Sequence, residues 1–202
     1  MILSSPTTIV LASGNPGKVK EIQAMLHQGA VRPQSDYGVA ECEETGTTFV
    51  ENAILKAKNA ALHCNTAAIA DDSGLVVDAL GGAPGVISAR YAGVGATDQD
   101  NNLKLLHALE GIPYERRRAR FICVLVYLRH ATDPCPLIAQ GSWEGYITEQ
   151  AQGDNGFGYD PLFWLPAQQC TSAQLPPDLK NTLSHRGQAL KELTALINQL
   201  GL

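Results

Sequence analysis

The chain has 202 residues and a formal net charge of -5, which argues against a general binder of nucleic acid or of membrane surfaces. Its length fits one domain over residues 1–202, which can form two lobes and bury a real core. No apolar run approaches the roughly 18 residues of a spanning helix, and the N-terminus lacks a basic signal-peptide start. We therefore expect a soluble, cytoplasmic protein.

Cysteine spacing excludes a common class of metal site. The cysteines are widely separated and form no CxxC pattern, so the spacing of zinc ligands is absent. Their odd number suits reduced thiols in the cytosol. We interpret all five as free structural residues: Cys42, Cys64, Cys123, Cys135 and Cys170.

The first predicted element is a buried strand over residues 8–12, and a helix over residues 19–27 follows it. The loop between them is rich in glycine and ends in a lysine: Ser13, Gly14, Asn15, Pro16, Gly17 and Lys18. Such a turn exposes backbone N–H groups at the positive end of a helix, which suits a phosphate that Lys18 can also reach. A plain turn is the alternative, because Val19 replaces the Ser or Thr of a Walker A loop.

The next segments combine irregular structure with one clear helix. Residues 29–40 are expected to be irregular apart from a short strand near Val31, and residues 41–47 form an acidic loop. A helix is predicted over residues 48–63, because their apolar side chains recur at helical spacing. Lys56 lies on this helix, and the spacing alone does not distinguish a functional lysine from one on a solvated face.

Two carboxylates stand together at Asp71 and Asp72, between the apolar runs 67–70 and 75–77. Both runs are short enough for buried strands, and we expect the polar residues between them to form a turn. Burial of ionised carboxylates is costly unless they are paired or bind a cation, so this junction favours a metal and an activated water. The alternative is a solvated turn in which Asp72 or Ser73 caps the next element.

The middle of the chain contains further strands and one capped helix. The sheet is predicted to continue over residues 75–80. Thr97 and Asp100 have the spacing of a capping box, which would open a helix that ends near Gly111. The basic run 116–118 is interpreted as a solvated face.

The longest apolar run of the chain, residues 120–129, is typical of a central strand. Residues 137–139 and 142–148 are predicted as antiparallel partner strands that Gly141 separates. A short strand over residues 162–164 follows the aromatic-bearing loop at residues 153–161.

The C-terminal helix begins beside two cationic side chains. Ser184 is the expected N-cap, which places His185 and Arg186 in the first turn. Positive groups there oppose the helix dipole, so an external anion or hydrogen-bond acceptor can compensate. The apolar stripe of this helix comprises Ala189, Leu190, Leu193, Leu196, Ile197 and Leu200.

Taken together and in order, five of these segments resemble the inosine triphosphate pyrophosphatase family. They are residues 13–18, 44–56, 70–74, 157–160 and 184–187. The resemblance runs from about Thr8 to the C-terminal helix and is strongest to the bacterial form, because residues 84–91 also match it. The family usually has Thr at the first position of the loop, where Ser13 keeps the hydroxyl.

The resemblance implies Mg²⁺-dependent hydrolysis of noncanonical purine nucleoside triphosphates, such as ITP, dITP and XTP, to the monophosphate and pyrophosphate. It also implies an α/β fold with an elongated mixed β-sheet flanked by helices, two lobes and a central cleft. A homodimer without nucleic-acid or membrane partners is expected.

Roles in phosphate chemistry are carried over by the same resemblance. Glu44 and Asp72 match the metal carboxylates, and Asp72 is also the candidate that activates water at the bond between the α and β phosphorus atoms. Lys18 and Lys56, with the N–H groups of the glycine-rich loop, would neutralise the triphosphate. The residues that would orient this group are Asp71 and Ser73, and which aspartate accepts the proton stays open.

Base recognition would fall to the later motifs. Phe157 can stack on a purine, Asp160 can accept hydrogen bonds from ring nitrogens, and His185 and Arg186 are donors suited to a 6-oxo group. The remaining positions that match substrate contacts in the family are Gly158, Tyr159 and Lys180.

Two other classes of protein remain as alternatives. A nucleotide-binding regulator would keep the phosphate loop, but it would not need carboxylates such as Glu44, Asp71 and Asp72. A phosphotransferase lacks support, because neither a Walker A nor a kinase signature is present.

Overall fold

The computed structural model describes residues 8–25 and 31–199. Leu26, His27 and Leu200, which belong to predicted helices, lie outside the described residues. The helices are α1 (Pro16–Met25), α2 (Phe49–Cys64), α3 (Asp98–Ala108), α4 (Pro177–Leu183) and α5 (His185–Gln199). The strands are β1 (Ile9–Ala12), β2 (Val31–Pro33), β3 (Ala68–Val77), β4 (Arg118–Leu128), β5 (Leu137–Ile147), β6 (Phe163–Leu165) and β7 (Cys170–Thr171).

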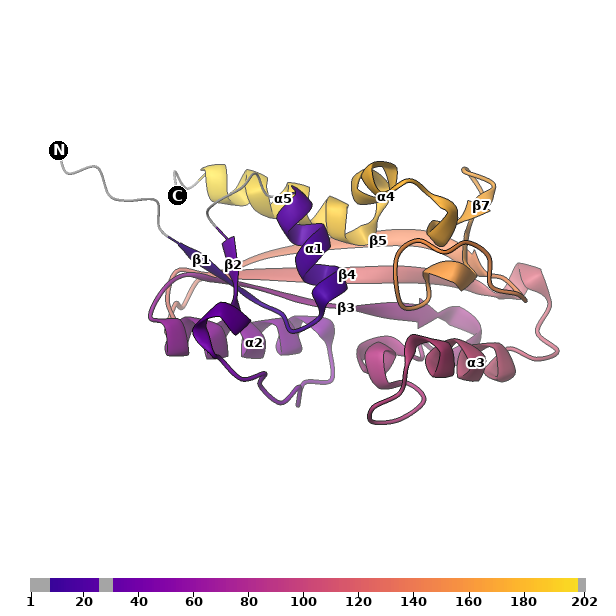
Figure 1. The fold of residues 1–202 in the computed structure, drawn as a ribbon, viewed down its shortest axis with the longest axis horizontal. Coiled ribbons are helices and arrows are strands. Elements are labelled where there is room, and N and C mark those ends of the chain that lie inside the picture. The colour runs from indigo at the N-terminus through magenta and orange to yellow at the C-terminus, as the bar shows by residue number, and fades with distance from the viewer. Residues whose placement is uncertain (1–7, 26–30, 200–202) are drawn as a thin grey trace. The chain divides into compact units, whose positions relative to one another are not determined.

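The strands form one mixed sheet in the order β2-β1-β3-β4-β5-β6-β7 (Figure 1). Strand β1 pairs in parallel with β2 and β3, whereas β6 pairs antiparallel with β5 and β7. The predicted α/β class, a mixed sheet with flanking helices, is confirmed. The central cleft between two lobes stays a prediction.

The described residues group into two compact units, each with its own core. The first unit comprises residues 8–25, 31–72, 123–140 and 188–199, and the second comprises residues 73–122 and 141–187. In the first unit, Leu11, Ile69 and Leu125 from three strands pack with Ile22 and Leu190 from helices. The second core contains Leu75, Leu105, Leu109, Phe121, Trp143, Leu162 and Phe163, with other buried side chains.

Local capping motifs explain where three helices begin, and the motifs at α3 and α5 were predicted from the sequence. Thr48 caps α2 and forms a reciprocal capping box with Glu51. Thr97 and Asp100 form the same motif at the start of α3. At α5, the Ser184 hydroxyl accepts a hydrogen bond of 3.1 Å from the Gly187 N–H.

The prediction of a turn at Asp71 and Asp72 is wrong. Strand β3 continues from Ala68 to Val77, so the two carboxylates lie inside a strand. Ammonium groups from other segments pair with both of them, which is why they can be buried there. Beyond Val77 the predicted strand is also wrong, because residues 78–80 form a 3₁₀ turn.

Two further predictions are wrong. Strand β5 is a single strand, because its alternation of buried and exposed side chains continues through Gly141. Arg117 is buried and not solvated, since its guanidinium donates to the carbonyls of Ile112 and Leu109, at 2.8 and 3.1 Å. Helix α4 was not predicted.

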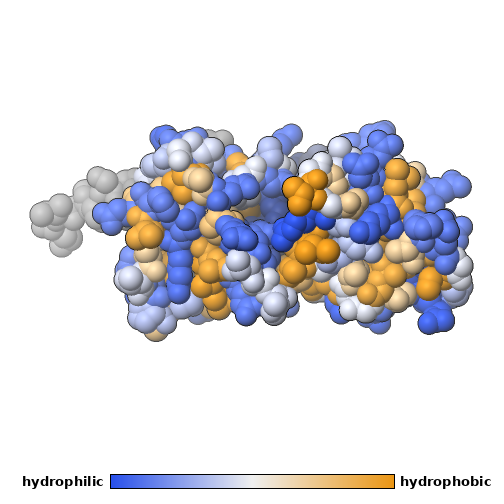
Figure 2. Space-filling view, turned by 90° about the horizontal axis from the view of Figure 1, so that it is seen from below, coloured by the Kyte–Doolittle hydropathy of each residue, from blue (hydrophilic) through white to orange (hydrophobic). Residues whose placement is uncertain are grey.

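The surface mixes polar and apolar side chains, as Figure 2 shows for one face of the molecule. The exposed large apolar residues belong to different segments and include Leu62, Val94 and Leu103. Among the helices of the described chain, none combines the length and apolar character of a membrane span. None of the five cysteines, which all lie in the described residues, forms a disulfide, as predicted.

Candidate functional site

The glycine-rich loop of the first unit joins β1 to α1 and packs closely against the Glu41 side chain. Helix α1 begins at Pro16, inside the predicted loop and three residues before the predicted start. The Asn15 side chain accepts a hydrogen bond of 3.0 Å from the Lys18 N–H, and the Ser13 hydroxyl accepts one of 3.3 Å from the Asn15 N–H. A Cβ at Gly14 would collide with the Glu41 side chain. Only glycine therefore fits this point of the loop unless Glu41 moves.

Lys18 points at a buried carboxylate of β3. Its Nζ lies 2.6 Å from Asp71 Oδ1, and the side chains are 16% and 0% exposed. The thiol of Cys123 donates to the other carboxylate oxygen, Asp71 Oδ2, at 3.1 Å. Both oxygens of Asp71 are thus engaged, and Lys18 does not lie on a solvated face.

Lys56 joins the two carboxylates that were assigned to a metal. Its Nζ donates to Glu44 Oε1 at 2.9 Å and to Asp72 Oδ1 at 2.7 Å. Burial opposes the charge of Lys56, but the carboxylates of Asp72, Asp71 and Glu44 outweigh it and raise its pKa. The helix α2, the acidic loop and β3 therefore converge on one ammonium group, which excludes the solvated-face interpretation of Lys56.

Asp72 has one oxygen without a protein partner. Among the described residues, no donor reaches its buried Oδ2. Burial raises the pKa of Asp72, and the ammonium groups of Lys56 and Lys18 oppose this shift only in part. An unpaired buried carboxylate oxygen is costly unless a ligand supplies a cation or a donor.

Glu44 and Asp72 are two carboxylates of this unit that share the ammonium group of Lys56. Within residues 8–25 and 31–199, no cluster of three or more His, Cys, Asp or Glu side chains suits a metal ion. Two carboxylates fit Mg²⁺, which is commonly held by one or two carboxylates together with waters and substrate phosphates.

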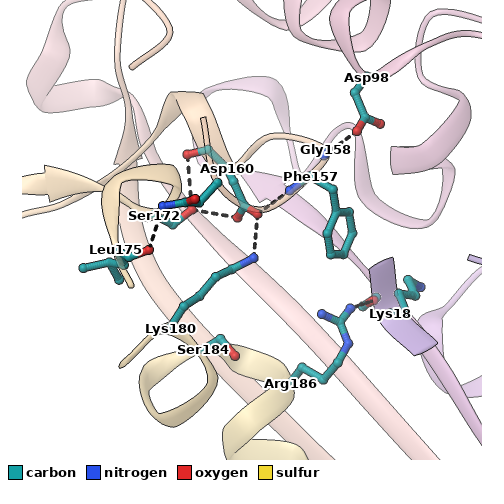
Figure 3. Close-up of polar contacts among 12 residues, drawn as sticks. Lys18, Asp98, Phe157, Gly158, Asp160, Ser172, Leu175, Lys180, Ser184 and Arg186 are labelled. Atoms are coloured by element: carbon teal, nitrogen blue, oxygen red, sulfur yellow. Dashed lines mark hydrogen bonds and ion pairs between the residues drawn. The ribbon is translucent and has the colours of Figure 1, made fainter. Parts of the chain in front are cut away.

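The second unit holds the remaining predicted site residues: Ser73, Phe157, Gly158, Tyr159, Asp160, Lys180, His185 and Arg186. Asp160 organises the loop among them and is 3% exposed. Its Oδ2 accepts hydrogen bonds from Lys180 Nζ at 2.6 Å and from the Phe157 N–H at 2.9 Å, and its Oδ1 accepts one from the Ser172 hydroxyl at 2.7 Å. Figure 3 shows these groups converging on the carboxylate. Both oxygens already hold the loop together, which limits their freedom to bind a base.

The Phe157 ring lies beside two cations. Lys180 Nζ is 5.1 Å and the guanidinium carbon of Arg186 is 5.8 Å from its centroid. Arg186 is 2% exposed and donates a hydrogen bond of 3.0 Å to the Ser73 hydroxyl. Lys180 is also buried. These contacts bring four of the predicted residues together.

His185 is part of an aromatic stack. Its ring is 4.8 Å from that of Phe121, at an interplanar angle of 13°, and 6.5 Å from that of Trp143. Neither aromatic residue was predicted as part of the site. Stacking on two core side chains fixes the orientation of the imidazole.

Tyr159 points into the core of the second unit. Its hydroxyl donates to the Ser88 carbonyl at 2.8 Å, and burial raises the pKa of the phenol. Sequence reasoning also missed Cys123 and Ser172, because each meets its carboxylate from a distant segment and no local motif marks the contact.

Comparisons with known proteins extend over nearly the whole chain. A family model described as the Ham1 family matches residues 9–196. A curated protein from Photobacterium profundum, named dITP/XTP pyrophosphatase, is 59% identical over 191 residues, which cover 94% of this chain and 97% of that protein. A solved HAM1 protein from Coxiella burnetii has a TM-score of 0.88 and 48% identity, covering 96% of this chain and 99% of that chain. The Staphylococcus aureus Ham1 protein has a TM-score of 0.84 and 41% identity, covering 95% and 98% of the two chains.

Proposed function

The chain belongs to the Ham1 family, and we propose that it hydrolyses noncanonical purine nucleoside triphosphates, such as ITP, dITP and XTP, to the monophosphate and pyrophosphate. This membership confirms the resemblance identified from the sequence. The observation that carries the proposal is the pairing of one partly buried ammonium, that of Lys56, with two carboxylates, Glu44 and Asp72. A triphosphate needs a positive group such as this ammonium, and the cation bound with it needs negative groups such as these carboxylates.

The first unit would bind the triphosphate. The N–H groups of the loop from Ser13 to Gly17 would face the phosphates at the start of α1, and Lys18 and Lys56 would add positive charge. Asp71 holds Lys18 in place through the 2.6 Å ion pair. Removing either ammonium should therefore weaken binding of the charged substrate.

Magnesium fits the first unit through Glu44 and Asp72. When bound, it would neutralise phosphate charge at the bond that breaks. The orphaned Oδ2 of Asp72 supports this fit, because a buried carboxylate oxygen needs a cation or a donor. A carboxylate at this position can also accept the proton of the attacking water, and we assign this role to Asp72.

The second unit would read the base. Phe157 would stack on the purine, and Arg186 and His185 would donate to its 6-oxo group. Asp160 and Lys180 would act mainly by holding the Phe157 loop, since they bond to each other at 2.6 Å. Gly158, Tyr159 and Ser73 would complete the shape of this site.

We also propose that both units act as one catalytic domain over residues 1–202 and that the chain works as a cytoplasmic homodimer. The nature of the substrate supports the location, because these triphosphates belong to the nucleotide pool. Binding of nucleic acid is not expected for a chain of net charge -5.

Incubation of the protein with ITP and Mg²⁺, followed by assay of the products, tests the proposed function. Release of pyrophosphate supports it. Release of inorganic phosphate would indicate a phosphatase, and no release with retained binding would indicate a regulator. Asp72→Asn, prepared in parallel, controls for contaminating enzymes, because it should release pyrophosphate at least about 10²-fold more slowly.

A further inference from the structure

Two side chains of helix α3 hold Gly158, which follows Phe157 in the loop that would recognise the base. The Asp98 carboxylate oxygen Oδ2 accepts a hydrogen bond of 2.6 Å from the Gly158 N–H, as Figure 3 shows. The Asn102 amide donates one of 3.0 Å to the Gly158 carbonyl. Residues four positions apart lie on one face of a helix, so both side chains can reach the same glycine.

Helix α3 is itself anchored within the second unit by its cap, its apolar side chains and a hydrogen bond. Its first turn is closed by the capping box of Thr97 and Asp100. The face that carries Asp98 and Asn102 continues to Leu105 and to the C-cap Leu109, which are both fully buried in the core of the second unit. The Asn101 side chain accepts a hydrogen bond of 2.7 Å from the Ala92 N–H, which ties the helix to the preceding loop.

The loop and helix α3 also share the lining of a cavity. A cavity of about 490 Å³ is lined by α3 and the loop, including Leu103 and Phe157. Gly158 adopts a φ of 61°, in the left-handed region that favours glycine. The two hydrogen bonds therefore hold the backbone of Gly158 in this conformation from α3.

These hydrogen bonds restrain the neighbouring residue, Phe157. Its own N–H donates to Asp160, and the next N–H along the chain donates to Asp98. The backbone of Phe157 is thus held on both sides, once from within the loop and once from α3. We propose that Asp98 and Asn102 are positioning residues that orient Phe157 for stacking on the base, an inference that rests on the function proposed above.

The test compares KM and kcat for ITP in Asp98→Ala, Asn102→Ala and wild-type protein. Each alanine variant should raise KM about threefold to tenfold, the effect of losing one hydrogen bond. The value of kcat should stay within about twofold, because the phosphate-binding residues lie in the first unit. Asp98→Asn should restore a KM near that of wild type, since its amide oxygen still accepts from Gly158.

Asp100→Ala is the matched control. It removes a carboxylate from the same turn of α3 and breaks the capping box, and this carboxylate accepts its hydrogen bonds from Thr97. Its melting temperature should fall while its KM for ITP stays that of wild type. An equal rise of KM in Asp100→Ala and Asp98→Ala would overturn the proposal, because helix stability would then explain both.

Unchanged KM values in both Asp98→Ala and Asn102→Ala would also overturn it. If Asp98→Ala does not fold, Asn102→Ala decides, since it leaves the first turn of α3 intact. A wild-type protein that binds ITP but releases no pyrophosphate would refute the proposed function instead. Calorimetric binding of ITP in EDTA would then still compare the variants, and equal affinities would refute the positioning role.

Discussion

Replacing Lys56 with methionine removes the ammonium that lies 2.9 Å from Glu44 Oε1 and 2.7 Å from Asp72 Oδ1. Methionine keeps an unbranched side chain, so packing along α2 should change little. The two carboxylates lose their shared cation. Since the Asp72 side chain is only 6% exposed, water replaces the ammonium poorly, and we expect a loss of stability.

The size of this loss follows from burial. Removing one partner of a buried ion pair costs about 3–5 kcal/mol. We expect the lower end of that range, because the Glu44 side chain is 24% exposed and can turn toward water. Urea denaturation in EDTA at pH 7 measures the free energy of unfolding. Lys58→Met, an exposed lysine on the same helix, is the matched control and should change it by less than about 0.5 kcal/mol.

Magnesium should act on this variant more strongly than on wild-type protein. Two carboxylates without an ammonium between them bind a cation better, so Mg²⁺ should raise the unfolding midpoint of Lys56→Met by more than that of wild type. Equal unfolding midpoints for Lys56→Met and Lys58→Met in EDTA would refute the reasoning, because Lys56 would then carry no structural charge pairing.

Three further predictions concern other residues. Asp72→Asn should lower kcat for ITP by about 10²–10⁴-fold while nucleotide binding persists, and wild-type turnover would contradict its role as base. Arg186→Ala should collapse the ratio of kcat/KM for ITP over ATP through loss of ITP activity, because arginine only donates and adenine offers no 6-oxo acceptor. An unchanged ratio would place selectivity elsewhere. Hydrogen bonds from Arg129 hold the pKa of Asp133 well below its usual range. The folded-state pKa is depressed, so Asp133 stabilises the fold above its unfolded pKa of about 4, and this contribution is lost as the pH falls toward the folded value. The difference in unfolding free energy between wild type and Asp133→Asn should therefore shrink from pH 7 to pH 3, and a constant difference would disprove the linkage.

The helices that begin with a local motif could be predicted from the sequence. Thr48 and Thr97 each stand three positions before an acidic residue, and both capping boxes form. Helix α4 has no such motif, and two prolines, Pro176 and Pro177, mark its start instead. Proline at the first position of a helix is common, and α4 does carry it there.

The continuous strand β3 could not be predicted, because its stability depends on partners from other segments. Lys56 meets Asp72 from 16 positions away, and Lys18 meets Asp71 from another helix. The local sequence does not reveal these ammonium groups, and a pair of aspartates without them predicts a turn. The same limit applies to Asp160, whose partners Ser172 and Lys180 follow 12 and 20 positions later.

Phosphorus NMR of a reaction with ITP and Mg²⁺ tests the central claim most directly. Hydrolysis between the α and β phosphorus atoms should produce inosine monophosphate and pyrophosphate in equal amounts, with no inosine diphosphate at any time. Accumulation of inosine diphosphate together with inorganic phosphate would contradict the account, because the bond between the β and γ phosphorus atoms would then be the one that breaks.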